Sequence, residues 1–494
     1  MSFNFKIFKT GLDEDFVQWL IESLYPEKCE HYGRLWDYYQ NTSVPWDRAG
    51  LPLGKLNDLS RRYVQAQEAG LPARITGVNR LNTSMTGGTA SQTQRKEIVI
   101  ENDIAWRVNA MVDYLFGKGM TIVSKVSDLQ KRKQIETLIN KVFASAGGVE
   151  FFQNMAVLGS VYGFVDCVVR ADGLFENRTS LTFDEAVDAA AKIDIDLVEA
   201  PRVLAILEEN NYKKIKFYVQ HFPQARNAVA KNGTFLSRIL GGKNSAGRVQ
   251  TYITEIISPA CRQLYDDGEL VEQNENPLGI IPVVHIQNIA QPCYYEGLSD
   301  VEPLVPLQDE LNTRLCDRAN RITMQSFKMY LAKGIEAGQE REIMPGRMWC
   351  TDNEQAQICE FGGDAAAPGE DTHIQDLREA LDKVSGVTPV VAGVIRSKLG
   401  NLTSAVAMKM TLMGTLAKTQ RKRLTYGEGI KQLCRIILTA LDKSGVYKTH
   451  TSEREIEVRF PDPLPEESTD KLNEAKIKMD LGVPQEKILE ELGY

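Results

Sequence analysis

The chain has 494 residues, of which 43% are hydrophobic and 25% charged. This composition is that of a folded globular protein, and it excludes a disordered chain, a collagen-like fibre and a small disulfide-stabilised protein. Lys and Arg number 58 against 66 Asp and Glu, so the net charge is −8. A protein that holds nucleic acid tightly usually carries a basic excess, so any contact with DNA is expected to be local or loose.

Membrane and export signals are not visible in the sequence. No apolar run approaches the roughly 20 residues that a membrane-spanning helix needs, and the first residues lack an apolar stretch followed by a small-residue cleavage site. We therefore expect no membrane partner and a protein that begins in a cytoplasm. The eight cysteines are scattered without a CxxC pair, which predicts reduced, mostly buried thiols.

The usual catalytic signatures are also missing. There is no GxxxxGK[ST] phosphate loop, no HExxH and no GxSxG, and no His has a Cys or acidic partner at metal-ligand spacing. The sequence thus predicts no catalytic residues, no cofactor and no metal. It favours a structural or binding role over an enzyme.

The first part of the chain reads as helices joined by polar loops. Residues 13–40 have helical spacing of apolar side chains, and Pro26 predicts two shorter helices because proline lacks the N–H that a helix interior needs. The stretches 41–57 and 79–94 predict loops. Further elements follow in order: a helix from about 97 to Gly117, a strand at Met120–Val123, helices around 127–144 and 150–160, and a strand at Val161–Arg170.

Residues 196–289 change to short strands. The predicted strands are Lys214–His221, Arg248–Ile257, Arg262–Tyr265 and Ile280–Ile286. Asp267-Gly268 follows a strand-like run and is a strong hairpin signal, because both residues adopt the positive φ of a tight turn. This part of the chain is predicted to be an α/β unit with antiparallel strands.

The second half begins with an amphipathic helix at 300–325. One stripe is apolar and the other positions are charged, which suits a helix packed between neighbours. A β-rich insertion is predicted at 326–372, with strands at Phe327–Lys333, Arg347–Thr351 and Gln357–Phe361. The remaining predictions are a helix at 373–385, an apolar loop at 386–400, a long helix at 405–443 kinked near 427–429 by glycines, a strand at Glu455–Phe460, and helices at 466–481 and 484–492.

Four stretches carry a resemblance to a known family. They are Tyr38-Tyr39, Glu101–Ile104 through Tyr114–Gly119, Tyr295–Asp300 running to Leu307–Asn312, and the pair Leu402–Ala407 and Phe460–Pro465. With these residues in this order, the chain resembles the portal proteins of tailed double-stranded-DNA bacteriophages, the head-to-tail connector family.

The resemblance implies an α+β, portal-like protomer that assembles into a ring. Its parts would be an α/β wing (1–297), a stem helix (298–325), a small β-rich clip (326–372), a second stem helix (373–385), a tunnel loop (386–404), a long kinked helix and strand returning to the wing (405–460), and a short helical crown (461–494). Such a protein is a structural component of the virion, placed at the capsid portal vertex, and is in the host cytoplasm during assembly.

The same resemblance implies the function and the partners. The ring would be the channel for DNA packaging and ejection. Its partners would be its own copies in a homo-dodecamer, double-stranded DNA held loosely and without sequence specificity, the terminase large subunit, the major capsid and scaffolding proteins, and a head–tail adaptor. An acidic channel would suit sliding DNA, because each lasting ion pair with phosphate would be a barrier to motion.

Three groups of residues are candidates for this role. The first group would face DNA in the tunnel loop: Val394, Ile395, Arg396, Lys398 and Leu399. Alternatively, its two cations are ordinary solvated charges, and its apolar residues pack one loop against another. The second would make stem contacts between subunits: Asp309, Glu310, Arg314, Asp317, Arg318 and Arg321. The third is a basic cluster on the long helix, which is alternatively an exposed face or a set of intersubunit salt bridges: Lys418, Arg421, Lys422 and Arg423.

Two other functions stay open from the residues alone. One is an α/β nucleic-acid-processing enzyme with an unrecognised site. The other is a non-viral ring-forming scaffold.

Overall fold

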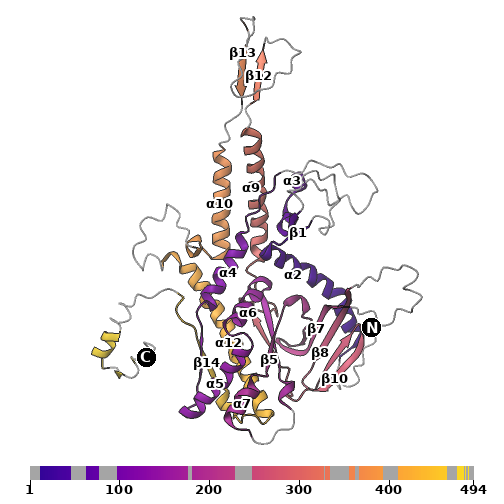
Figure 1. Cartoon of the computed structure of the whole chain (residues 1–494), viewed down its shortest axis with the longest axis vertical. Helices are drawn as coiled ribbons and strands as arrows, with labels where there is room; N and C mark the ends of the chain where they lie inside the picture. Colours follow the sequence, from indigo (N-terminus) through magenta and orange to yellow (C-terminus); the bar gives the residue numbers. More distant parts are fainter. Residues whose placement is uncertain are drawn as a thin grey trace, which may run out of the picture. The chain divides into compact units, whose positions relative to one another are not determined.

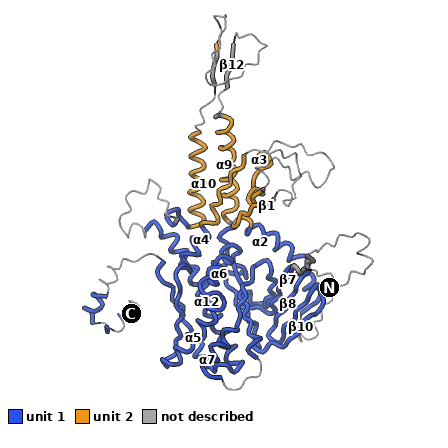
Figure 2. Tube along the Cα trace, in the orientation of Figure 1, with its two compact units in different colours: residues 1–36, 107–302, 387–494 blue, residues 37–106, 303–386 orange. Residues whose placement is uncertain are grey.

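The computed structural model describes residues 12–45, 63–76, 97–175, 181–227, 248–326, 329–333, 357–361, 367–392, 410–463 and 475–482, with single residues at 355, 484, 485 and 488 (Figure 1). The chain divides into two compact units (Figure 2). Unit 1 contains residues 1–36, 107–302 and 387–494, and unit 2 contains residues 37–106 and 303–386. Each unit is therefore built from segments that lie far apart in the sequence.

The N-terminal helices form one run rather than the two separate helices that were predicted. α1 (Glu14–Trp19) leads into a π-helical turn (Leu20–Leu24) and then into α2 (Tyr25–Gln40). The backbone N–H of Tyr25 donates to the carbonyl of Leu20, which is the wider π spacing. This turn directly precedes Pro26, so the extra residue accommodates the ring and missing N–H of proline without ending the helix.

Unit 1 contains a five-stranded antiparallel sheet in the order β10-β9-β8-β7-β6. Its strands are β6 (Ile206–Glu208), β7 (Asn211–Asn227), β8 (Arg248–Ile257), β9 (Cys261–Asp266) and β10 (Glu269–Glu275). The predicted hairpin is confirmed: Asp267 and Gly268 connect β9 to β10 with φ values of 53° and 86°. One face of the sheet packs on α1 through a buried cluster that includes Val17, Phe217 and Tyr265.

A second sheet of unit 1 has three antiparallel strands in the order β11-β4-β5. They are β4 (Phe164–Arg170), β5 (Asp194–Val198) and β11 (Val283–Gln287). β4 is buried almost along its whole length, with helix α6 (Val149–Tyr162) packed against it. A third pair joins β3 (Thr121–Ser124) to β14 (Ile456–Arg459), beside α5 (Leu129–Ser145).

The long helix α12 (Met413–Lys443) is the main element that covers these sheets within unit 1. One face of its C-terminal half is buried, including Ile430, Leu433 and Ile437. The helix is continuous through Gly427 and Gly429, where the sequence predicted a kink, and both glycines allow close packing. A Cβ added at Gly429 would lie 2.5 Å from Ile286 of β11, and one at Gly427 would lie 3.4 Å from the Phe460 ring.

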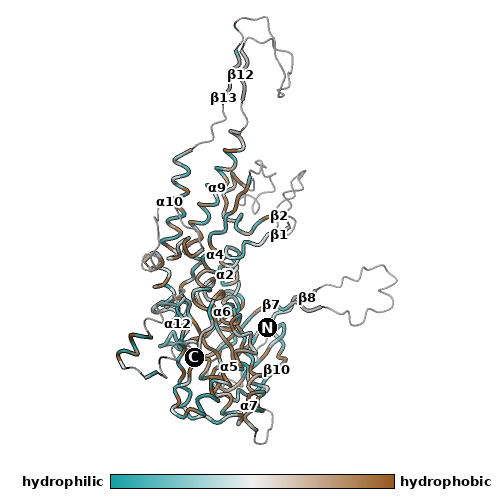
Figure 3. The backbone as a smooth tube through the Cα atoms, turned by 60° about the vertical axis from the view of Figure 1, so that its left-hand side comes forward, coloured by the Kyte–Doolittle hydropathy of each residue, from teal (hydrophilic) through white to brown (hydrophobic). Residues whose placement is uncertain are grey.

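Unit 2 is dominated by two helices, α9 (Val305–Ser326) and α10 (Pro368–Ser385), which pack side by side (Figure 3). A two-stranded antiparallel pair, β12 (Met329–Lys333) and β13 (Gln357–Phe361), lies between them in sequence. The unit also holds β1 (Ser43–Pro45) paired with β2 (Tyr63–Gln65), the short helix α3 (Ala73–Thr76) and the start of α4 (Asp103–Phe116).

Several predicted boundaries differ from the structure. α10 begins at Pro368 rather than at 373, because proline is favourable in a first helical turn. Strand β1 lies inside the predicted 41–57 loop. Helix α7 (Phe183–Ala190) and strand β5 were not predicted. The predicted strand Arg347–Thr351 and most of the predicted C-terminal helices lie outside the described residues.

The fold is a mixture of helices and antiparallel sheets, so the α+β class is confirmed at that level. Among the described residues, no helix is long and apolar enough to cross a membrane.

A first prediction concerns Gly163, which ends α6 with φ of +94°. A Cβ there would lie 2.4 Å from the carbonyl oxygen of Gly297. Gly163→Ala should therefore lower the free energy of unfolding by about 1–3 kcal/mol or more, measured by thermal or urea unfolding. Gly33→Ala is the control, because nothing lies within 4 Å of its Cβ position in α2 and alanine favours helix. Equal stability of the two variants would contradict the close approach.

Candidate functional site: the helix pair and its anchors

The α9–α10 pair is held by a buried apolar seam with ion pairs beside it. Leu311 and Leu315 of α9 and Ile374, Leu377 and Leu381 of α10 are all buried. Next to the seam, Arg318 lies 3.3 Å from Asp371, and Arg321 pairs with Glu370. The two helices together contain eight Asp or Glu (309, 310, 317, 370, 371, 376, 379, 382) and five Lys or Arg (314, 318, 321, 378, 383). The pair is therefore a rod with an acidic excess of three charges.

The beginning of α9 is fixed by a network of side-chain amides within unit 2. Asn312 donates to Gln67 Oε1 (2.9 Å), and its own Oδ1 accepts from the backbone N–H of Glu101 (3.0 Å). Gln308 Oε1 accepts from the N–H of Asp103 (3.2 Å), while Gln67 donates to Asn102. Gln67, Gln308 and Asn312 are buried. Buried amides rigidify a structure when all their hydrogen bonds are made.

A second contact at this end of α9 joins it to α2 and to the turn before α3. The Tyr38 hydroxyl donates to Asp309 in a short hydrogen bond. Gly70 lies against both groups, since a Cβ there would be 1.9 Å from Asp309 Oδ1 and 2.5 Å from the Tyr38 oxygen. Only glycine fits, so the residue types at these three positions depend on one another.

Unit 1 contains a buried charge cluster that we call the Asp300 cluster: Asp300, Lys418, Lys422 and Ser160. Lys418 Nζ lies 2.8 Å from Asp300, Lys422 also pairs with Asp300, and Lys422 donates to Ser160 Oγ (2.8 Å). Burial alone would raise the pKa of Asp300, but the two ammonium groups hold it below its usual range. Burial lowers the pKa of Lys422, although Asp300 opposes that shift. The cluster ties α12 to the residues directly before α9.

The residues next to Asp300 have equally defined roles. Gly297 and Gly163 approach each other so closely that neither position has room for a Cβ. Ser299 Oγ donates to the Val161 carbonyl (2.6 Å) and accepts from the backbone N–H groups of Val301 and Glu302 (3.0 and 3.2 Å). Gly297 therefore allows two backbone segments to approach each other, Ser299 caps the short helical turn that follows, and Asp300 pairs with the lysines of α12.

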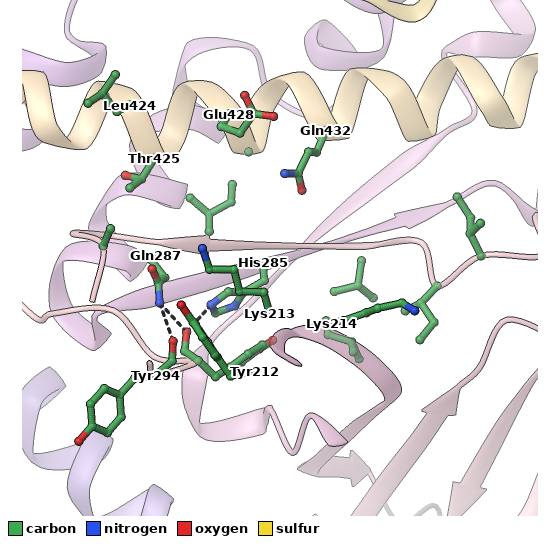
Figure 4. Close-up of a pocket in the computed structure, with 18 of the residues that line it drawn as sticks. Tyr212, Lys213, Lys214, His285, Gln287, Tyr294, Leu424, Thr425, Glu428 and Gln432 are labelled. Atoms are coloured by element: carbon green, nitrogen blue, oxygen red, sulfur yellow. Dashed lines mark hydrogen bonds between the residues drawn. The ribbon is translucent and has the colours of Figure 1, made fainter. Parts of the chain in front are cut away.

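A cavity of about 670 Å³ opens in unit 1 between β11, the first residues of β7 and α12 (Figure 4). His285 lies in its wall, with Nδ1 2.6 Å from Asp166 Oδ1 and Nε2 2.7 Å from the Tyr295 carbonyl. Gln287 donates to the carbonyls of Tyr294 and Tyr295. Both ring nitrogens of His285 are taken up by these bonds, so the His–Asp pair holds β11, β4 and the Tyr295 loop together.

Comparison with known proteins decides the family. The family described as "Phage portal protein, SPP1 Gp6-like" matches residues 30–493, which is nearly the whole chain. The chain belongs to this phage portal family. No curated protein matches its sequence. Among solved structures, a chain of the "Virion of native gene transfer agent (GTA) particle" aligns with 12% identity and a TM-score of 0.39, covering 79% of this chain and 89% of that one.

Family membership confirms the resemblance drawn from the sequence and gives the chain a phage portal role. The portal family is structural rather than enzymatic. Within the described part of the chain, no three His, Cys, Asp or Glu side chains are grouped so that they could hold a metal ion.

The six charged residues predicted to make stem contacts lie on α9, and the pairs that the structure gives them are within one chain. Arg314 pairs with Glu310 (2.7 Å) on the same helix, and Asp317 pairs with Arg74 of α3 (2.5 Å). Together with the Arg318 and Arg321 pairs to α10 and the Tyr38–Asp309 bond, all six predicted residues have a partner in the protomer. Their role in contacts between subunits stays a prediction.

The four residues predicted as a basic cluster are not brought together on one exposed surface. Lys418 and Lys422 are buried on Asp300. Arg423 is half-buried, donates to the Pro461 carbonyl (2.6 Å) and lies over the Phe460 ring. Arg421 alone is exposed. The predicted tunnel-loop residues Val394, Ile395, Arg396, Lys398 and Leu399 lie outside the described residues.

The sequence did not predict two contacts, one before and one after residues 393–409, that hold the flanking backbone in place. One is Asp300 as the partner of α12, for which the signal was two lysines four residues apart and therefore on one face of a helix. The other is Arg107, which is buried in α4 and donates to the Val387 carbonyl (2.9 Å). Nothing in the local sequence indicates this second contact, because it is made to a backbone atom.

The Asp300 cluster generates a second prediction. Asp300→Asn leaves two ammonium groups buried without a counter-charge, so it should cost about 3–5 kcal/mol in the free energy of unfolding, measured by urea unfolding at neutral pH. Asp371→Asn is the matched control: its carboxylate is 62% exposed and pairs with Arg318, so its loss should cost less than about 1 kcal/mol.

The pH dependence of that difference is a third prediction. The pKa of Asp300 is lower in the folded than in the unfolded protein, so its contribution is fully present above the unfolded value and is lost as the pH falls through the folded one. The stability gap between wild type and Asp300→Asn should not narrow between pH 7 and pH 5 and should narrow only below about pH 4. A gap that already closes between pH 7 and pH 5 would contradict the lowered pKa.

Proposed function

We propose that this protein forms the portal ring at a unique capsid vertex, where it is the channel for packaging and ejection of double-stranded DNA and the docking site for the terminase motor and the tail connector. Membership of the phage portal family supports the proposal at its coarse level. The observation that carries the finer proposal is the distribution of charge around the predicted tunnel loop.

Between Asp382 and Glu428 the chain has no acidic residue. The same 45 residues contain eight cations (Lys383, Arg396, Lys398, Lys409, Lys418, Arg421, Lys422 and Arg423) in a chain whose net charge is −8. Asp300 offsets part of the charge of Lys418 and Lys422. Even with that offset, residues 383–427 carry a positive net charge, and they include the proposed tunnel loop at 386–404.

This distribution suits a channel for moving DNA. A few cations attract the phosphates over about 10 Å at ordinary ionic strength, which is enough to keep a duplex centred. The acidic excess of the α9–α10 pair opposes adhesion elsewhere, because few phosphate contacts then need to be broken as DNA advances. In this proposal Arg396 and Lys398 contact DNA transiently, and Val394, Ile395 and Leu399 form the apolar rim of the constriction.

The proposed parts follow the domains predicted from the sequence. The α9–α10 pair is the stem, residues 326–372 with β12 and β13 are the clip that meets the terminase large subunit and later the head–tail adaptor, and residues 1–297 with 405–460 are the wing. Residues 461–494 are the crown. The major capsid and scaffolding proteins contact the assembled dodecamer, and ATP hydrolysis belongs to the separate motor.

Ring formation is tested by native mass spectrometry and electron microscopy of the purified full-length protein. The expected result is a closed ring with a central hole and a mass of about 660 kDa, for a dodecamer of the 55.3 kDa chain. A monomer or dimer at micromolar concentration under all salt conditions would refute the proposal.

The role of the loop cations gives a fourth prediction. Arg396→Glu with Lys398→Glu should leave the ring mass unchanged and should reduce the DNA packaged per particle in an in vitro packaging reaction, because the duplex loses its local attraction. Lys133→Glu on the exposed surface of α5 is the control and should package normally. Normal packaging by the loop variant would show that these residues do not contact DNA.

A further inference from the structure

Strands β7 and β8 extend beyond the sheet to which they belong. The last pair between β8 and β9 is Ile253↔Asp266, whereas β7 and β8 stay paired from Pro223↔Tyr252 to Asn227↔Arg248. Strand β6 pairs with β7 only up to Phe217. Within the described residues, the end of this hairpin is thus a two-stranded ribbon with no strand on either side, and Figure 3 shows it leaving the body of unit 1. Such a ribbon is marginally stable alone and gains stability from a partner.

The sequence that contains the β7–β8 hairpin is also one-sided in charge, as are residues 383–427. From Asn210 to Thr254 there is no acidic residue, and there are eight cations: Lys213, Lys214, Lys216, Arg226, Lys231, Arg238, Lys243 and Arg248. Arg226 and Arg248 stand on the ribbon itself, at the pairs Arg226↔Val249 and Asn227↔Arg248. A partner that fits this ribbon must be acidic, because like charges would repel it.

The same chain carries a surface of the opposite kind at the edge of the same sheet. β10 is the outermost strand, and all seven of its residues are exposed. It contains three glutamates and no cation, and its apolar Leu270 and Val271 are 40% and 63% exposed. Its outer row of backbone N–H and C=O groups has no strand partner among the described residues, which is a template for another strand.

We infer that the β7–β8 ribbon of one copy docks on the acidic edge strand β10 of the next copy in the ring. This inference rests on the proposed ring and names the surfaces that join its subunits. Backbone hydrogen bonds along β10 would extend the sheet from one subunit to the next, Leu270 and Val271 would be covered, and the positive charge of the ribbon would be attracted to the three glutamates of β10.

The charges also select the geometry of association. Two β10 edges brought together in a two-fold dimer would place glutamates against glutamates, and two ribbons would place cations against cations. Only the contact between unlike surfaces is attractive, and a heterologous contact closes into a ring when the rotation between neighbouring copies allows it.

The test is a charge swap in the full-length protein, with ring assembly followed by mass photometry over a dilution series. Glu269→Lys with Glu272→Lys should raise the protein concentration at which rings dissociate by about tenfold or more, and so should Arg226→Glu with Arg248→Glu. The variant with all four changes should recover assembly, because the attraction is restored with its signs exchanged. The control is Glu30→Lys with Asp188→Lys, two exposed residues on helices α2 and α7. It changes the net charge by the same amount as the first pair and should assemble like wild type.

A photo-crosslinking residue at Val271 supplies a readout that does not depend on affinity. Crosslinks to peptides of 223–252 from another copy support the inference. Rings that form equally well in all variants, with no such crosslink, would overturn it while leaving the proposed portal ring intact. If wild type forms no ring at all, the proposed function itself fails.

The competing partner for a basic ribbon is nucleic acid, and the same variants separate the two. Binding of a short blunt-ended DNA duplex is measured for wild-type and Arg226→Glu, Arg248→Glu rings. Loss of DNA binding with unchanged ring assembly would overturn the inference in favour of a DNA-contacting ribbon. Loss of assembly that the four-residue swap restores supports the contact between subunits.

Discussion

Two lysine ammonium groups of α12 share one aspartate carboxylate in the interior of unit 1, and much of the proposed mechanism depends on that arrangement. A buried cluster with one more positive than negative charge is stable only if its groups are held at short distance and cannot exchange partners. Asp300 therefore fixes the rotation and the position of the first half of α12. Since α12 follows the proposed tunnel loop directly, the same contact fixes one end of that loop, while Arg107 holds the backbone at Val387 on the other side.

The buried polar side chains around the start of α9 hold the backbone in place. Gln67, Asn102, Gln308 and Asn312 bond to one another and to the backbone at the start of α9, and Ser299 caps the residues before it. Each is buried or partly buried with its hydrogen bonds satisfied, so none is available to a substrate. In the proposed function, a rigid frame of this kind would let a loop and a distribution of charge act on DNA.

What the sequence predicted correctly was local. The Asp267-Gly268 turn, the stripe of Leu311 and Leu315, and the order of strands in 196–289 depend on neighbours within a few residues. The π turn before Pro26 was missed because a proline inside a helical pattern normally indicates a break. The Asp300–Lys422 pair spans 122 residues, and spacing alone does not say which of several lysines a buried aspartate will meet. The family resemblance singled out Tyr38, Asn102, Asp300 and Asn312, yet only the structure gives each a physical reason.

The pairing of β3 with β14 has a consequence for synthesis of the protein. Thr121–Ser124 cannot complete its sheet until Ile456–Arg459 has left the ribosome, because the two strands bond to each other. Unit 2 is inserted between segments of unit 1, so its helices emerge while unit 1 still lacks α12 and β14. A nascent chain is therefore unable to complete unit 1 until nearly all of it has been translated. A truncated product that ends before Ile456 lacks the partner strand of β3, so it is recognisably incomplete before it can meet another copy.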